Sequence, residues 1–271
     1  MTNVPSPSQQ PHTEDPLRYA FVEMLFALAV SQVAIHAADL VGIQSSLLEK
    51  LPGFAHLTLG LIVIAASWVG WRQSQSPGMK EQIRSLFSVR FVGLLIDVLL
   101  VILYFILVRS VEIEQKSGAT VHTSASALPE SFWLMAVFVV YALWDLIADV
   151  FSAGCLPTLS LLRLLWKGVR VAVVCTASSL LCLALCYVAY RSAQSAVNGI
   201  AVALVDAALL TVVLLFRVVK AIENPLSRAL GVTDCKAFLT PRTVQGKELP
   251  FALFFLGLYG ALLFAAQFAQ A

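Results

Sequence analysis

Long apolar runs constrain this chain more than any other feature of its sequence. Each run is close to the roughly 20 residues that a helix needs to cross the hydrocarbon core of a bilayer. The runs lie at residues 18–40, 54–71, 91–108, 131–151, 170–190, 199–219 and 250–268. The last run contains Gly257 and Gly260, so it could span the bilayer, re-enter it or lie on its surface, and we favour a full span.

The composition excludes a soluble globular protein. Of the 271 residues, 59% are hydrophobic and 13% are charged, whereas an ordinary soluble domain is about 45–50% apolar and about 25% charged. The sequence therefore predicts an all-α, polytopic membrane bundle of six or seven transmembrane helices in contact with the lipid bilayer. The net charge of +2 lacks the dense basic character of nucleic-acid-binding proteins, so we expect no nucleic-acid partner.

The basic residues predict the orientation, because Lys and Arg near span ends are retained on the cytoplasmic side. With a cytoplasmic N-terminus, only four of the 18 basic residues fall outside, and these are Lys50, Arg109, Lys116 and Arg191. We therefore expect a multi-pass protein of a bacterial inner membrane with its N-terminus in the cytoplasm.

This topology divides the chain into four parts. A flexible cytoplasmic tail (1–16) precedes a six-helix transmembrane domain (17–219), a basic amphipathic cytoplasmic segment (220–249) and a seventh transmembrane helix (250–268). We expect the basic segment to continue the sixth helix and to break at Asn224-Pro225. The outer loop 109–130 ends in the polar stretch VHTSASALPE, which indicates a solvated cap or a docking surface.

The basic segment carries Arg228, Lys236 and Arg242. Such a segment either lies on the membrane surface, held by anionic lipid headgroups, or docks a protein partner. Both interpretations stay open at this point.

Acidic residues inside the spans are the most informative polar groups. A carboxylate at the middle of a span costs about 2.5–3.5 kcal/mol on insertion scales, so Asp97 and Asp206 should face the bundle interior or be protonated. These two carboxyl groups either hydrogen-bond to a neighbouring helix, or pair with Arg90 or Arg170, or bind and transfer ions or protons.

On the fourth span, Tyr141, Asp145 and Asp149 share one face because they are four residues apart. These two acids predict a cation vestibule on the cytoplasmic side.

The first span is the most polar one. Glu23 lies near its inner end, and Gln32, His36 and Asp39 share a face towards its outer end. His36 and Asp39 can pair, either as a simple polar contact or as the outer mouth of a pathway.

Motifs of soluble-type enzymes are missing from the sequence. It contains no GxSxG elbow, phosphate-binding loop, dinucleotide fingerprint, HExxH or paired CxxC. We therefore expect no catalytic residues, no cofactor, no metal site and no enzyme activity. A lipid-modifying enzyme that uses Asp145 and Asp149 is a minor alternative, because the second acidic motif of such enzymes is absent.

Residues 18–31, RYAFVEMLFALAVS, resemble the first helix of the lysosomal and bacterial potassium channels that carry a Phe-Ser-Asp motif. The matching positions are Arg18, Phe21, Phe26, Ala27 and Ala29, with Leu28 and Ser31 conservative and Val22-Glu23 in place of Ser-Asp. The resemblance implies a six-helix unit with a cytoplasmic N-terminus, whose first helix lines the pore of an oligomer. On that basis Phe21, Phe26 and Ser31 are pore-lining candidates.

Two functions are consistent with these features. The first is a cation pathway, for potassium or protons, in a homo-oligomer. Its candidate ion-pathway residues are Glu23, Gln32, His36, Asp39, Asp97, Asp145, Asp149 and Asp206. The second is a non-conducting membrane subunit, such as a scaffold, sensor or effector, that docks a soluble or membrane partner through Arg228, Lys236 and Arg242.

Overall fold

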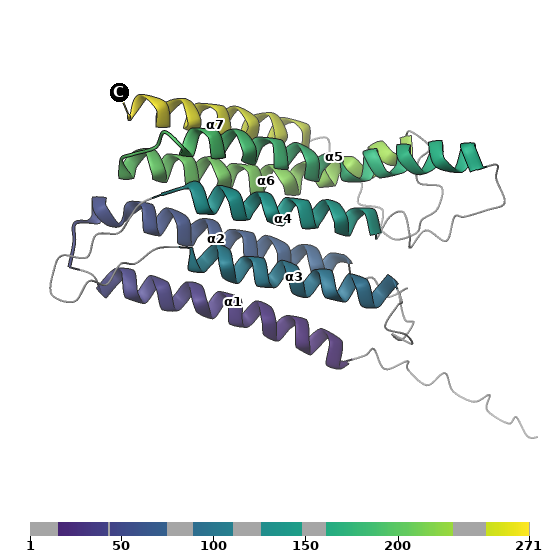
Figure 1. Cartoon of the computed structure of the whole chain (residues 1–271), viewed down its shortest axis with the longest axis horizontal. Helices are drawn as coiled ribbons and strands as arrows, with labels where there is room; N and C mark the ends of the chain where they lie inside the picture. Colours follow the sequence, from purple (N-terminus) through teal and green to yellow (C-terminus); the bar gives the residue numbers. More distant parts are fainter. Residues whose placement is uncertain are drawn as a thin grey trace, which may run out of the picture.

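The described part of the chain is entirely helical. The computed structural model describes residues 16–42, 44–74, 89–110, 126–147, 161–229 and 248–270. Within these ranges it contains seven helices and no strand (Figure 1). They are α1 (Pro16–Gly42), α2 (Leu47–Ser74), α3 (Val89–Arg109), α4 (Leu128–Leu146), α5 (Leu161–Ala193), α6 (Gly199–Ala229) and α7 (Glu248–Phe268). The predicted all-α fold is confirmed.

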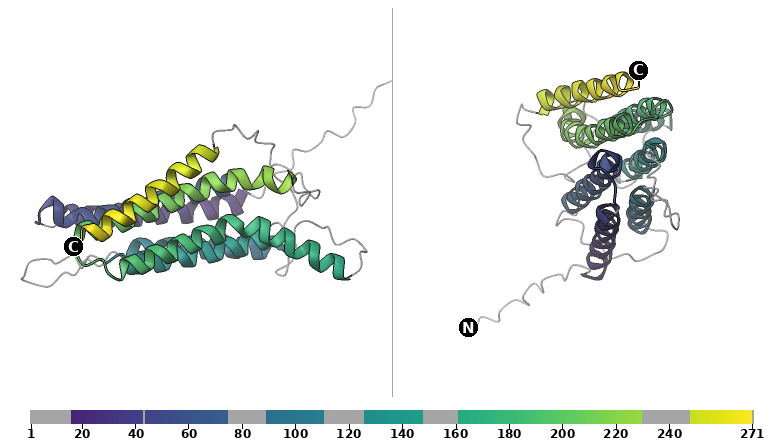
Figure 2. Two further views of the ribbon diagram at one scale, coloured as in Figure 1. Left: turned by 90° about the horizontal axis from the view of Figure 1, so that it is seen from above. Right: turned by 90° about the vertical axis from the view of Figure 1, so that its left-hand side faces the viewer.

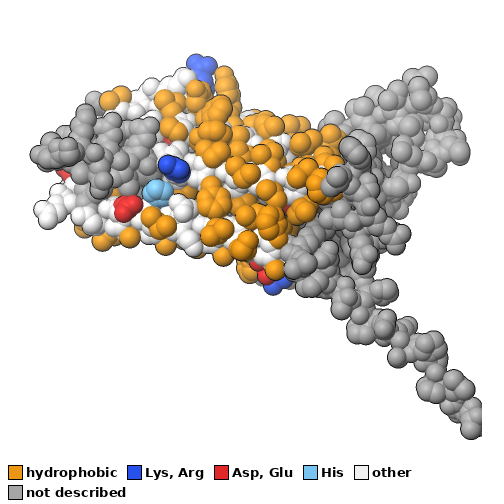
Figure 3. Space-filling model, turned by 60° about the horizontal axis from the view of Figure 1, so that its bottom comes forward, with side chains coloured by type: hydrophobic (Ala, Val, Ile, Leu, Met, Phe, Trp, Pro, Cys, Tyr) orange, Lys and Arg blue, Asp and Glu red, His pale blue; other side chains and the backbone are white. Residues whose placement is uncertain are grey.

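Six of the described helices are long and apolar enough to cross a membrane. They are α1, α2, α3, α4, α6 and α7. A spanning segment must satisfy every backbone polar group internally, which a helix does. The chain is therefore a multi-pass membrane protein in contact with lipid. In Figure 3, hydrophobic side chains cover the middle of the visible face, and charged side chains lie towards its ends.

The helices lie side by side along one direction (Figure 1), and α1 and α7 lie at opposite edges of the bundle when it is viewed end-on in Figure 2. At one edge, α1 packs on α2 and α3. At the other, α7 packs mainly on α6. The interior is therefore formed by α2, α4 and α6 together with their neighbours α3 and α5. We call the end that holds Leu47, Arg109 and Gly199 the outer end, after the predicted orientation, and the opposite end the inner end.

Glycines allow close contact between two of these helices. A Cβ added at Gly60 of α2 would lie 2.9 Å from Cγ2 of Val108 in α3. Small residues at such positions let helix backbones approach in lipid, where packing drives association.

Several helix boundaries differ from the prediction; α2 begins at Leu47 rather than 54 and α5 at Leu161 rather than 170, and two further differences concern α4 and α6. Helix α4 begins at Leu128 rather than 131, which brings Glu130 out of the predicted loop and into the helix. Helix α6 continues through Asn224-Pro225 to Ala229, so the predicted break is wrong. A proline removes only one helical hydrogen bond, and a helix can continue past it with a bend.

Several predicted residues fall outside the description. Asp149, Lys236 and Arg242 lie outside the described residues, and only the backbone of Arg228 is described.

Candidate functional site

Three buried titratable side chains lie in the outer half of the bundle. His56 of α2, Glu130 of α4 and Asp206 of α6 are 2%, 4% and 1% exposed. His56 Nδ1 lies 2.8 Å from Glu130 Oε1. Asp206 is close enough to Glu130 for the two carboxyl groups to interact electrostatically. We call these three residues the outer cluster.

The ring of His56 is oriented by one hydrogen bond. Its Nε2 is 2.8 Å from the carbonyl oxygen of Leu107 in α3. Because a carbonyl only accepts, Nε2 carries a proton and donates it. The other ring nitrogen, Nδ1, lies at ion-pair distance from Glu130 Oε1 but makes no hydrogen bond among the described residues. The ring therefore faces Glu130 with Nδ1 while Nε2 is fixed to α3.

Asp206 has the least satisfied carboxyl group of the interior. Neither of its oxygens has a hydrogen-bond partner among the described residues, and the same holds for Oε2 of Glu130. Two negative charges in an apolar interior repel each other, and protonation of one carboxyl removes that repulsion. This pair of carboxyl groups is therefore suited to hold a proton.

Three hydroxyl groups meet closer to the inner end. The Tyr104 hydroxyl of α3 donates to Ser67 Oγ of α2 at 2.7 Å. It also lies 3.0 Å from the Tyr141 hydroxyl of α4, which is itself hydrogen-bonded to Ser67. Arg217 of α6 interacts electrostatically with Tyr141, and Asp97 of α3 with Tyr104. We call Ser67, Tyr104 and Tyr141 the hydroxyl cluster.

Ser67 and Tyr141 of the hydroxyl cluster, together with Arg217, lie on the same faces of α2, α4 and α6 as the three residues of the outer cluster. His56 and Ser67, Glu130 and Tyr141, and Asp206 and Arg217 are each eleven residues apart. At 3.6 residues per turn, eleven residues make about three turns, so each pair shares a face and lies roughly 16 Å apart along its helix. Helices α2, α4 and α6 all run from the outer to the inner end, so the three spacings stack one cluster above the other.

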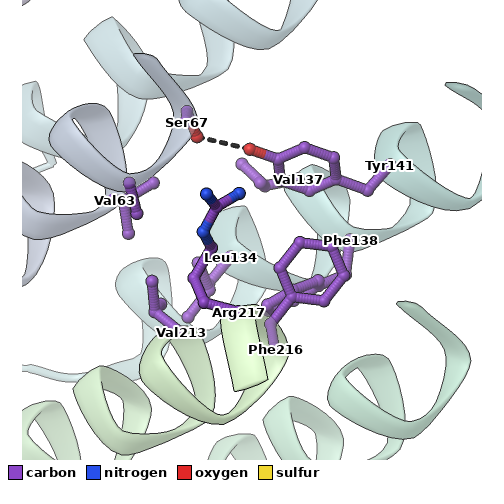
Figure 4. Close-up of a pocket in the computed structure, with 10 residues that line it drawn as sticks. Val63, Ser67, Leu134, Val137, Phe138, Tyr141, Val213, Phe216 and Arg217 are labelled. Atoms are coloured by element: carbon purple, nitrogen blue, oxygen red, sulfur yellow. Dashed lines mark hydrogen bonds between the residues drawn. The ribbon is translucent and has the colours of Figure 1, made fainter. Parts of the chain in front are cut away.

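A small cavity lies between the clusters and has room for about one water molecule. Its apolar lining includes Val63, Leu134 and Val213, which come one or two turns after the residues of the outer cluster. At the inner end, Ser67, Tyr141 and Arg217 supply the polar lining (Figure 4). The cavity thus borders the hydroxyl cluster, and the residues of the outer cluster lie one or two helical turns beyond its apolar end.

Asp145 of α4 is held by partners at the inner end. Its Oδ1 lies 2.9 Å from Lys220 Nζ of α6, and its Oδ2 accepts a hydrogen bond of 2.9 Å from Ser179 Oγ of α5. A carboxylate that is paired in this way is poorly suited to concentrate cations. The vestibule predicted around Asp145 and Asp149 therefore has one member in a salt bridge and the other outside the described residues.

Of the pore-lining candidates on α1, Phe26 packs against the hydroxyl cluster, and Phe21 and Ser31 lie on the exposed side of the helix. The Phe26 ring packs against the rings of Trp71 and Tyr104, with distances of 6.2 and 6.3 Å between centroids. Phe21 and Ser31 are exposed. Ser31 Oγ donates to the carbonyl oxygen of Ala27, a helical turn away in the same helix. The pore-lining candidates therefore do not share one environment.

Polar residues of α1 occupy both of its ends. Glu23 pairs with Arg72 at 3.1 Å near the inner end. Gln32 and His36 are half-buried and Asp39 is exposed. The predicted His36–Asp39 pair does not form in the described structure, where His36 Nε2 is buried without a hydrogen-bond partner.

The sequence analysis missed most of the outer cluster. It placed Glu130 in a solvated loop, which is wrong because the side chain is buried against His56. Pro129 was an available signal, since proline is favoured in the first turn of a helix. The eleven-residue spacings were a second signal, but they indicate a shared site only when it is known which helices are neighbours.

The site defines a class rather than a family. The described residues define a polytopic helical membrane protein with ionisable groups buried between its helices. Comparison of the chain with known protein families, curated proteins and solved structures finds no match. Among the described residues, no three His, Cys, Asp or Glu side chains converge to hold a metal ion.

Proposed function

We propose that this protein conducts protons across the membrane through the interior of α2, α4 and α6. The observation that carries the proposal is the buried outer cluster, in which the Asp206 carboxyl has no hydrogen-bond partner among the described residues. Chains of Asp, Glu and His inside membrane spans are typical of proton relays.

The relay follows from the chemistry of the residues. A proton from the outer side binds to the Asp206–Glu130 pair, and His56 Nδ1, which lies 2.8 Å from Glu130 Oε1, can accept this proton and return it to the carboxyl group. A water molecule in the cavity carries it to the hydroxyl cluster, in which each hydroxyl both accepts and donates a proton. The proton leaves at the inner end, and each group returns to its starting state after the next transfer.

The narrow route favours protons over potassium. A potassium ion needs a shell of oxygen ligands in place of its water, whereas the cavity has room for about one water molecule and mostly apolar walls. The proposed route lies within one chain, while the resemblance of residues 18–31 to potassium channels implies a pore between chains. That resemblance and the homo-oligomer remain predictions.

The test is proton flux into liposomes that contain the purified protein, followed with an internal pH-sensitive dye under a potassium diffusion potential. We expect Asp206→Asn and Glu130→Gln to slow the flux by about tenfold or more, because each removes a proton-transfer group. The matched control is Asp39→Asn, since Asp39 is exposed on α1. Asp97→Asn tests the acid beside Tyr104 in the same assay.

Unchanged flux in folded Asp206→Asn and Glu130→Gln protein would contradict the proposal. Equal loss in Asp39→Asn would shift the route to α1 and support the channel resemblance instead. A complete lack of flux in the unmodified protein would favour the second candidate function, a non-conducting subunit that docks a partner through the basic segment. Joint replacement of Arg228, Lys236 and Arg242 by Glu would then be expected to release that partner.

A further inference from the structure

We infer that the ion pair between Asp145 of α4 and Lys220 of α6 is a gate between the cavity and the inner solution. The inference rests on the proposed proton conduction, because it names the contact that regulates the same route. The cavity is lined by residues of α2, α4 and α6. Water from the inner end therefore has to pass between these three helices to reach it.

Contacts between each pair of these helices close the inner end of the cavity. Ser67 of α2 is hydrogen-bonded to Tyr141 of α4, and Figure 4 shows Arg217 extending from α6 towards this bond. Arg217 also lies against the backbone of α2, where a Cβ added at Gly70 would be 2.5 Å from its Nη1. Between α4 and α6, the rings of Tyr141 and Phe216 pack with 5.1 Å between their centroids. This ring contact is apolar, so it depends on how closely the two helices are held together.

The ion pair holds α4 and α6 together about one turn closer to the inner solution. Asp145 comes four residues after Tyr141 in α4. Lys220 comes three residues after Arg217 in α6. Lys220 Nζ lies 2.9 Å from Asp145 Oδ1, and Ser179 of α5 donates a hydrogen bond of 2.9 Å to Oδ2. The carboxylate therefore connects α4, α5 and α6 between the cavity and the inner end.

The two members of the pair differ in their exposure to the inner solution. The side chain of Asp145 is 3% exposed, whereas that of Lys220 is 25% exposed. The carboxylate is thus enclosed, and the ammonium group, on a flexible four-carbon chain, is the member that can move into the solution. While the two charges are together, little water screens their attraction, and the helices stay closed. When Lys220 moves away, the space between α4 and α6 opens, and a proton can leave the route there.

A purely structural role for the pair predicts a different result. Its loss would then lower the stability of the bundle but leave the proton flux unchanged, because the cavity would stay closed. The pair of Glu23 and Arg72 provides a comparison, since it also lies near the inner end with 3.1 Å between the charged groups. Neither of these two residues lines the cavity. Arg72→Gln therefore controls for the loss of an ion pair at the inner end.

The experiment measures proton flux into liposomes with an internal pH-sensitive dye under a potassium diffusion potential. Lys220→Met and Asp145→Asn should each raise the flux by about tenfold or more, because the attraction that holds α4 against α6 is lost. Asp145→Asn keeps an acceptor for the Ser179 hydroxyl, so it provides a second test if Lys220→Met does not fold. Lys220→Arg keeps the charge and should conduct like the unmodified protein, and so should Arg72→Gln.

A double variant tests whether the additional flux follows the proposed route. Lys220→Met combined with Asp206→Asn should conduct as slowly as Asp206→Asn alone, because the proton still has to bind to the outer cluster. A leak through a damaged bundle would not depend on Asp206. Fast flux in the double variant therefore overturns the gate.

The remaining outcomes separate this inference from the proposed function. Equal or lower flux in folded Lys220→Met and Asp145→Asn than in a conducting unmodified protein overturns the gate and keeps proton conduction. Flux that appears only in these variants and is lost with Asp206→Asn keeps the gate and overturns conduction by the unmodified protein. If neither the unmodified protein nor any variant carries protons, both are overturned.

Discussion

Two buried aspartates of the interior differ in what surrounds them. Asp145 has a lysine and a serine as partners, whereas neither oxygen of Asp206 has a hydrogen-bond partner among the described residues. A paired buried carboxylate supports the fold once its partner is present, while an unpaired one reduces stability.

This contrast predicts opposite effects of one substitution. Asp206→Leu should raise the free energy of unfolding in detergent by about 1–3 kcal/mol, because it removes an unsatisfied buried group. Asp145→Leu should lower it by about 2–4 kcal/mol, because Lys220 loses its counter-charge inside the bundle. A loss of stability in Asp206→Leu as large as that in Asp145→Leu would mean that Asp206 has a stabilising partner.

The hydroxyl cluster allows a test that leaves the packing intact. In Tyr141→Phe the ring still packs against Phe138 and Phe216, with distances of 6.1 and 5.1 Å between ring centroids. The hydrogen bonds to Ser67 and Tyr104 are lost. We expect proton flux in liposomes to fall by about tenfold or more. Tyr259→Phe is the control, since that hydroxyl donates to the Leu185 carbonyl outside the route. Equal flux in both variants would exclude the hydroxyl of Tyr141 from the relay.

At the scale of the helices, a close contact between α2 and α3 positions the imidazole of His56. Gly60 lies on α2 one turn after His56, and Val108 lies on α3 one residue after Leu107, whose carbonyl accepts from His56. The close approach of α2 and α3 therefore fixes the hydrogen bond that orients the imidazole. The packing of α2 on α3 therefore sets the orientation of the His56 ring.

Gly60→Ala should disturb that contact. The added Cβ would come within 2.9 Å of the Val108 side chain, whose branched Cβ leaves it little freedom to move. We expect the free energy of unfolding to fall by about 1–3 kcal/mol, as measured by chemical denaturation in detergent. The control is Gly257→Ala in α7, where nothing lies within 4 Å of the added atom. Restored stability in the Gly60→Ala, Val108→Ala double variant would identify the clash as the cause.

At the scale of the whole molecule, the helices determine on which side the chain emerges. Helix α7 ends at the outer end of the bundle, whereas α1 begins at the inner end (Figure 1). A reporter that is active only outside the cytoplasm should therefore work when fused after Gln270, and one fused after Ser74 should not. The reverse pattern would contradict the orientation predicted from the basic residues.

The fold class follows from the sequence, whereas much of the site does not. Runs of apolar residues dictate helices because lipid offers no partner for backbone polar groups, and this constraint acts on each segment by itself. The sequence also marked Asp97, Asp145 and Asp206 as unusual, because burying a charge in a span is costly whatever its neighbours are.

Only the tertiary structure decided which polar side chains meet. The contact between His56 and Glu130 joins residues of α2 and α4, and Arg217 reaches Gly70 from α6, far away in sequence. Such contacts depend on how helices pack against one another, and apolar surfaces that look alike in sequence do not encode this order locally. The sequence by itself determined that this chain spans a membrane with acids buried inside. The packing of the helices decided that Asp145 has partners and that neither oxygen of Asp206 has a hydrogen-bond partner among the described residues, and it brought His56 against Glu130.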